Sequence, residues 1–202
     1  MSIPLKEPTM SADPLPDWFF PPPEGWTADD LDRLPPSAPS HIELIDGALI
    51  VTAPQRSFHA NVMNRLWADL DAQAPEGIGV QTQMTVKLGE RQRPEPDVLV
   101  FRRPEQDDSS RTYYLPEDVL LMVEIVSPES EERDRKTKPI KYAEAGIPHF
   151  WLVEEESPGS PEIRVYELDR VTQRYTCTSI AREVLKLSVP FPIAIDVRRL
   201  NR

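Results

Sequence analysis

The chain has 202 residues, a formal charge of −11 and a single cysteine, Cys177. This length suits one domain of ordinary size with an appended arm, and a lone cysteine excludes an internal disulfide framework. No run approaches the roughly 20 apolar residues of a membrane-spanning helix, and the N-terminus lacks the apolar stretch of a signal peptide, so we expect a cytoplasmic protein with no membrane partner.

The acidity is unevenly distributed. Residues 1–50 hold nine acidic and two basic side chains, whereas RDRKTKPIK at 133–141 holds five basic side chains and one acidic. Net acidity argues against a nucleic-acid partner, because phosphate binding usually leaves a basic footprint. The distribution nevertheless allows a local basic patch at 133–141, and a solvated helix face explains the same charges equally well.

The N-terminal segment reads as an arm. Residues 1–39 contain ten of the 23 prolines and no sustained apolar period, so we expect an extended acidic arm at 1–39 followed by a single domain at 40–202. The aromatic residues of DWFFPPP (Trp18, Phe19, Phe20) are expected to dock on the body or on a second subunit, because water disfavours such large apolar groups.

Regular elements follow in chain order. TADDLDRLP predicts a short helix capped by Thr27 and ending before Pro35. HIELIDGALIVT predicts a β-hairpin that turns at Asp46-Gly47, since this dipeptide readily adopts positive φ. Apolar residues at helical spacing then predict an amphipathic helix from Ser57, its N-cap, to residue 73.

The remainder predicts strands around one further helix. Pro139 is expected to begin that helix and Gly146 to end it. Strands are predicted at 79–89, 96–103, 118–127, 148–156, 162–169 and 174–181. The resulting order, ββαβββαβββ, predicts an α/β (α+β) fold with a mixed central sheet flanked by helices.

Glu124 stands out within the strand LLMVEIV. Strand alternation places it on the face of Met122 and Val126, and the strand is apolar on both faces, as in the centre of a covered sheet. Asp97 opens the strand VLVF and shares a face with Leu99. If the two strands are neighbours, the carboxylates converge, and converging carboxylates call for a shared proton, a basic partner or a divalent cation such as Mg²⁺ or Mn²⁺.

Two further residues have alternative interpretations. Glu43 interrupts the first hairpin strand, either as a third acid of the site or as a solvent-facing residue. His59 borders the apolar stripe of its helix, either as a hydrogen-bonded core histidine or as an active-site group. Taken singly, Asp97 could also be a turn residue after proline, and Glu124 the buried partner of an arginine.

The ordered series HIELIDGALIV, His59, PEPDVLVF, VEIVSPES and DRKTKPIKYAEAGIPHFWLVE resembles the Uma-two family of restriction-type endonucleases, a branch of the PD-(D/E)XK nuclease superfamily. The likeness runs from about Glu43 to Glu154. It implies a restriction-endonuclease-like fold, a metal-dependent endonuclease acting on DNA, and a homodimer.

The resemblance also implies a site. Its metal ligands are Asp97, Glu124 and the backbone carbonyl of Ile125, with Glu43 as an additional acid, and the metal is Mg²⁺ or Mn²⁺. The superfamily's lysine, two residues after the glutamate, is replaced here by Val126.

In this branch the lysine moves to the following helix, which indicates Lys138, with Lys136 and Lys141 as competitors. Pro139 disfavours helical geometry at Lys138 and places it at the helix entrance. The accessory residues expected near the site are His59, Ser127, Tyr142 and Gln83.

A second hypothesis keeps the fold without the chemistry. Net acidity, Val126 in place of lysine and the aromatic arm also fit a catalytically weak or inactive dimeric binding or assembly module. The sequence leaves open the sequence preference, the choice between DNA and RNA, and the biological role.

Overall fold

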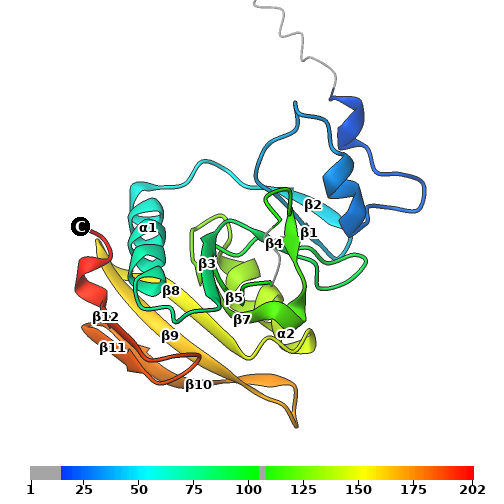
Figure 1. The fold of residues 1–202 in the computed structure, drawn as a ribbon. Coiled ribbons are helices and arrows are strands. Elements are labelled where there is room, and N and C mark those ends of the chain that lie inside the picture. Colours follow the sequence, from blue (N-terminus) through cyan, green and yellow to red (C-terminus); the bar gives the residue numbers. More distant parts are fainter. Residues whose placement is uncertain (1–14, 105–107) are drawn as a thin grey trace, which may run out of the picture.

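A six-stranded mixed sheet forms the centre of the computed structural model, which describes residues 15–104 and 108–202 (Figure 1). Its strand order is β10-β9-β8-β7-β5-β3. The strands are β3 (Ile78–Thr82), β5 (Val98–Arg102), β7 (Val119–Ile125), β8 (His149–Ser157), β9 (Ser160–Asp169) and β10 (Arg174–Ala181). Only β7 and β8 pair in parallel within this sheet, because a helical crossover joins them. The prediction of a mixed sheet flanked by helices is therefore confirmed.

Two helices cover opposite faces of this sheet. Helix α1 (Ser57–Asp71) packs with the β7 residues Leu121, Val123 and Ile125. Helix α2 (Lys138–Glu144) packs on the other face, where the core contains Met122. The alternation predicted for β7 is correct, since its side chains divide between these two cores.

Short strands complete the structure. A hairpin of β1 (Ile42–Ile45) and β2 (Ala48–Val51) precedes α1, and a parallel pair of β4 (Thr85–Val86) and β6 (Tyr113–Tyr114) flanks the sheet. The predicted turn is confirmed, with φ of 51° at Asp46 and 78° at Gly47. A second hairpin, β11 (Val184–Leu187) with β12 (Ile193–Asp196), packs in the α1 core and was not predicted.

Several boundaries differ from the predictions. Ser57 is the first residue of α1 rather than its N-cap, which is Arg56 and makes no side-chain cap hydrogen bond. The strand expected at 79–89 breaks at Gln83, whose φ of 53° turns the chain out of the sheet. Pro139 lies inside a longer helical segment instead of beginning one, because a five-residue π-helix at Arg133–Thr137 precedes α2.

The described part of the N-terminal segment forms two short 3₁₀ helices, of which the second packs on the body. These are η1 (Asp17–Phe19) and η2 (Ala28–Arg33). Two other 3₁₀ turns, at Pro116–Asp118 and Val197–Arg199, belong to the body of the protein. Thr27 caps η2 as predicted, in a reciprocal capping box with Asp30. The expectation of an extended arm over residues 1–14 lies outside the described residues.

Within residues 15–104 and 108–202, no helix combines the length and the apolarity of a membrane span.

Candidate active site

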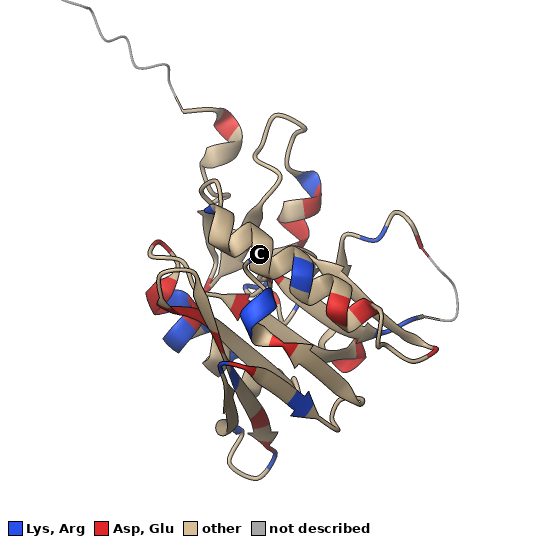
Figure 2. Cartoon of the chain, turned by 90° about the vertical axis from the view of Figure 1, so that its left-hand side faces the viewer, with Lys and Arg blue, Asp and Glu red and all other residues tan. Residues whose placement is uncertain are grey.

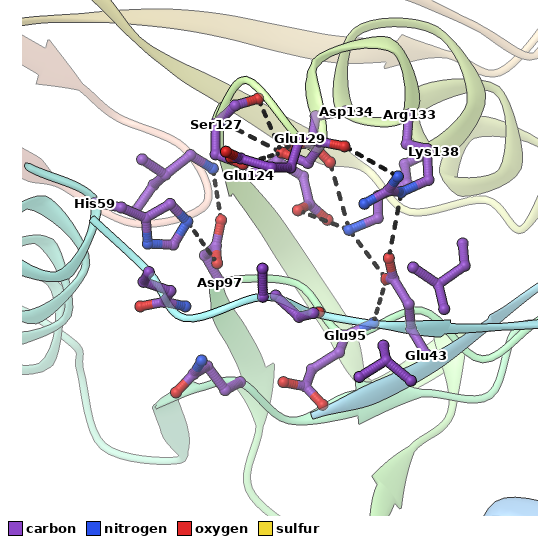
Figure 3. A pocket seen from close by; sticks show the side chains of 18 of the residues that line it. Glu43, His59, Glu95, Asp97, Glu124, Ser127, Glu129, Arg133, Asp134 and Lys138 are labelled. Carbon is purple, nitrogen blue, oxygen red and sulfur yellow. Dashed lines mark hydrogen bonds and ion pairs between the residues drawn. The ribbon is translucent and has the colours of Figure 1, made fainter. Parts of the chain in front are cut away.

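A pocket of ≈ 190 Å³ opens where β5 begins and β7 ends, beside the β1–β2 hairpin and the first turn of α1. Figure 3 shows its side chains pointing toward one another from these elements. The acidic residues that line it are Glu43, Glu95, Asp97, Glu124, Glu129 and Asp134. The basic residues that line it are Arg56, Arg133 and Lys138. Negative charge is therefore in excess around the cavity.

Asp97 and Glu124 meet because β5 and β7 are antiparallel neighbours. Val98 lies opposite Val123, and extending this register by one residue places Asp97 opposite Glu124. The backbone amide of Asp97 donates to the Val123 carbonyl at 3.0 Å, which fixes the start of β5 against β7. The strand register therefore brings the two carboxylates together, as expected from the sequence.

His59 and the β7 backbone hold the Asp97 carboxylate. The Ile125 amide donates to Oδ2 at 2.7 Å, and His59 Nε2 lies 3.1 Å from Oδ1. Burial of the imidazole lowers the pKa of His59, but its hydrogen bond to Asp97 and the charge of that carboxylate outweigh burial and raise the pKa. His59 is thus not only a core histidine, since α1 presents it to the pocket.

Lys138 is the basic partner of the buried Glu124. Its ammonium lies 3.0 Å from Glu124 Oε2, 3.0 Å from Glu43 Oε2 and 3.5 Å from Asp134 Oδ1. Burial disfavours the ammonium, but the charges of these three carboxylates outweigh it and raise the pKa of Lys138 well above its usual value. Tyr142 donates to the other oxygen of Glu124.

The π-helix explains how Lys138 reaches the site despite Pro139. Lys138 itself is helical, with φ −60° and ψ −45°, and its amide donates to the Arg133 carbonyl five residues back. Proline in an α-helix clashes with the carbonyl four residues before it, and a widened turn relieves that clash. The prediction that Lys138 lies at the helix entrance is therefore wrong. Its side chain points into the pocket from a continuous helical segment.

The competing lysines lie elsewhere. Lys136 is 73% exposed in its side chain and pairs with Glu132 at 3.3 Å. Lys141 pairs with Asp46 in the hairpin turn at 2.8 Å. Neither lines the pocket, so Lys138 is the lysine that the fold brings to Glu124.

Glu43 is an interior residue rather than a solvent-facing one. Its exposure is 3%, and Oε2 accepts the Glu95 amide at 3.2 Å in addition to contacting Lys138. Of the accessory residues, Ser127 and Gln83 line the pocket, while Tyr142 reaches it through Glu124. The whole set named from the sequence is therefore gathered around one cavity.

The residues at this pocket that sequence reasoning missed include Arg56, Glu95, Glu129, Ser130, Arg133 and Asp134. Asp134 is 1% exposed, and its Oδ2 accepts from Ser130 while Oδ1 faces Lys138. The spacing of four residues between Asp134 and Lys138 was a usable signal, since residues so spaced share one face of a helix. Glu95 carried no such signal, because only the fold brings it beside Glu43.

Burial raises the pKa of three carboxyl groups in the pocket. It raises the pKa of Glu124 well above the usual range, and Asp134 adds to this more than any other carboxylate, while Lys138 opposes it. Burial also raises the pKa of Asp134 and of Glu95. These carboxyl groups therefore bind protons more readily than they would in water, mainly because burial disfavours their charged form and partly because neighbouring carboxylates repel one another.

The carboxylate oxygens of Asp97 and Glu124 are chemically suited to bind a divalent cation. Asp97 and Glu124 line the same cavity, and Mg²⁺ characteristically takes one or two carboxylates and keeps several waters. Among the described residues, however, no three or more histidine, cysteine, aspartate or glutamate side chains are grouped to hold a metal ion. Each Asp97 and Glu124 oxygen already contacts a protein donor, so an incoming cation must share these oxygens with His59 and Lys138.

Comparisons with known proteins place the chain in a family. The Uma2 family, described as "Putative restriction endonuclease", matches residues 11–198. The chain therefore belongs to the Uma2 family, as the sequence motifs had suggested. No curated protein matches it.

A solved structure shares the fold. A crystal structure described as a putative nuclease belonging to DUF820, from Anabaena variabilis ATCC 29413, aligns with a TM-score of 0.66 and 17% sequence identity. The alignment covers 87% of this chain and 97% of that one. The likeness shows that the two proteins share a fold over most of this chain.

Proposed function

We propose that this protein is a divalent-metal-dependent endonuclease that hydrolyses DNA phosphodiester bonds. The observation that carries the proposal is the juxtaposition of Asp97 and Glu124 on neighbouring strands, with Lys138 Nζ 3.0 Å from Glu124. Membership of a family described as restriction endonucleases supports the substrate class. Figure 2 shows acidic and basic residues mixed along the ribbon. Because acidic residues outnumber basic ones around the pocket, a bound cation would offset the negative charge that a phosphate meets there.

Each residue has a proposed role. Asp97, Glu124 and the Ile125 carbonyl would hold Mg²⁺ or Mn²⁺. When bound, such an ion polarises a phosphate oxygen and lowers the pKa of a coordinated water.

The other side chains prepare these groups. Lys138 orients the attacking water or neutralises charge that develops on the phosphate. His59 fixes the carboxylate of Asp97 through its contact at 3.1 Å. Glu43 keeps the Lys138 ammonium in the pocket, and Tyr142 fixes the second oxygen of Glu124.

Plasmid nicking tests the catalytic site. Supercoiled plasmid incubated with Mg²⁺ or Mn²⁺ should be nicked by the native protein and not in the presence of a chelator. Asp97→Asn and Glu124→Gln should each lower the rate about a hundredfold, because each removes one charged ligand. Glu162→Gln is the matched control, since Glu162 is 2% exposed but pairs with Arg182 away from the pocket. Equal nicking by all four proteins would refute the proposed site.

One observation favours a catalytically weak binding module as the alternative function. Both oxygens of Asp97 and of Glu124 already have protein donors. A ligand that binds only the native state must raise the melting temperature, so Mg²⁺ titration distinguishes the two functions. A melting temperature that does not respond to millimolar Mg²⁺ would support the binding module.

We also propose the wider organisation. Residues 40–202 form the nuclease domain, residues 1–39 form an arm, and the protein acts as a cytoplasmic homodimer. Exposed aromatic residues at the end of η1 support the dimer, since Phe19 is 46% and the C-cap residue Phe20 is 59% exposed on the single chain.

A further inference from the structure

The pocket's two partly exposed arginines have no full anionic partner. Arg56 is 65% exposed in its side chain and lies 3.4 Å from Glu129 Oε1 through Nη2. Arg133 is 31% exposed and donates through Nη1 to the Glu129 carbonyl at 3.2 Å. Its Nε is buried without a hydrogen-bond acceptor among the described residues, and its nearest carboxylate, Glu43, is 3.8 Å away.

Lys138 is less available than these two arginines to bind an incoming phosphate. Its ammonium is shared among three buried carboxylates, so a phosphate would have to compete with all of them. Arg56 and Arg133 would lose only a long ion pair and a backbone acceptor. Guanidinium groups bind phosphate oxygens with strong charge-assisted hydrogen bonds.

Glu129 connects the two arginines. It lies in the turn between β7 and the helical segment, lines the pocket, and has a side chain that is 57% exposed. Figure 3 shows Glu129 beside Ser127 and Arg133 at the edge of the site. Its carboxylate is therefore the anion at this edge, and more than half of the side chain is exposed to solvent.

We propose that Arg56 and Arg133 form a phosphate-binding site for the nucleic-acid backbone and that the Glu129 carboxylate competes for it in the free protein. This inference rests on the proposed function, because it names how that same pocket receives a phosphodiester. Arg56 also lines an adjoining pocket with Phe58, Ser127 and Arg135, in which the acidic residues are Glu131, Glu154 and Glu155.

The proposal predicts opposite effects for neighbouring substitutions. Glu129→Gln should tighten binding of a short fluorescein-labelled DNA duplex about threefold to tenfold, because it removes the competing anion. Arg56→Gln and Arg133→Gln should each weaken binding by about the same factor and lower the salt dependence by about one phosphate contact. Anisotropy in Ca²⁺ or in a chelator measures this without requiring cleavage.

The same segment offers matched controls. Glu132 and Lys136 form an exposed ion pair at 3.3 Å that does not line the pocket. Glu132→Gln and Lys136→Gln change the net charge identically to the test variants, so they report non-specific electrostatics alone.

The readouts separate the two proposals. Opposite shifts in the test variants with small shifts in the controls would support the phosphate site, even if plasmid nicking failed. Test and control variants that shift equally would overturn it, even if the protein nicked DNA. Inorganic phosphate added as competitor should reduce the difference between Glu129→Gln and the native protein if a free phosphate suffices, and leave it unchanged if the site needs the nucleic-acid backbone.

Discussion

At the scale of single residues, Lys138 is the counter-ion of three buried carboxylates. Three buried carboxylates surround its ammonium, so its removal leaves Glu43, Glu124 and Asp134 to repel one another without compensation. Breaking a buried ion pair by deleting one partner typically costs about 3–5 kcal/mol, because the remaining charge stays desolvated.

We therefore expect Lys138→Met to lower the free energy of unfolding by about 3 kcal/mol in urea titrations without metal. Lys141→Met should cost at most about 1 kcal/mol, since Lys141 pairs with the 60% exposed Asp46. Mg²⁺ should recover part of the loss in Lys138→Met, because a bound cation neutralises the same carboxylates. Equal stability of the two variants would show that Lys138 contributes no more than a surface lysine.

At the scale of elements, the buried guanidinium of Arg93 joins η2 to the body, beside the Lys87–Asp29 ion pair and the hydrogen bond from the Ala28 amide to the Glu90 carbonyl. Arg93, with 3% of its side chain exposed, donates to both oxygens of Asp32 at 2.9 and 3.0 Å and to the Ala28 carbonyl. The hydrogen bond from Arg93 is the main cause that lowers the pKa of Asp32 below its usual value.

The lowered pKa gives this contact a defined pH dependence. The unfolded chain binds a proton more readily than the folded one, so the contribution is present above about pH 3.9 and disappears as pH falls through the lower, folded-state pKa. Asp32→Asn should therefore reduce the melting temperature at neutral pH and match the native protein in strong acid. A difference that persists unchanged in acid would contradict an ionic origin.

The elements also show what sequence reasoning could reach. Period-two alternation predicted the two faces of β7, and Asp-Gly predicted the turn of the first hairpin, because both depend on local backbone geometry. Lys138 was indicated by the family resemblance, but its helical geometry was not predictable, since it depends on the π-helix that precedes Pro139. Glu95 reaches the pocket only through the long-range contact of its amide with Glu43.

At the scale of the whole molecule, two groups of exposed large apolar residues lie far apart, while others such as Val51, Trp67 and Ile140 are exposed singly. Leu15, Phe19 and Phe20 are 56%, 46% and 59% exposed in the N-terminal segment. Ile180 and Val184 are 52% and 50% exposed near the β10 edge of the sheet. Figure 1 places η1 and β10 on opposite sides of the molecule, so a variant at one end leaves the other intact.

Of the two groups, the aromatic one is the better candidate for the contact of the dimer that we propose. Aromatic side chains dominate protein interfaces because they bury large areas at low entropic cost, whereas isolated aliphatic residues on a surface are ordinary. We expect sedimentation at micromolar concentration to show a dimer that the double variant Phe19→Ser, Phe20→Ser converts to a monomer. The double variant Ile180→Ser, Val184→Ser should remain dimeric. A native monomer, or a dimer that only the second pair dissociates, would exclude the aromatic segment as the contact.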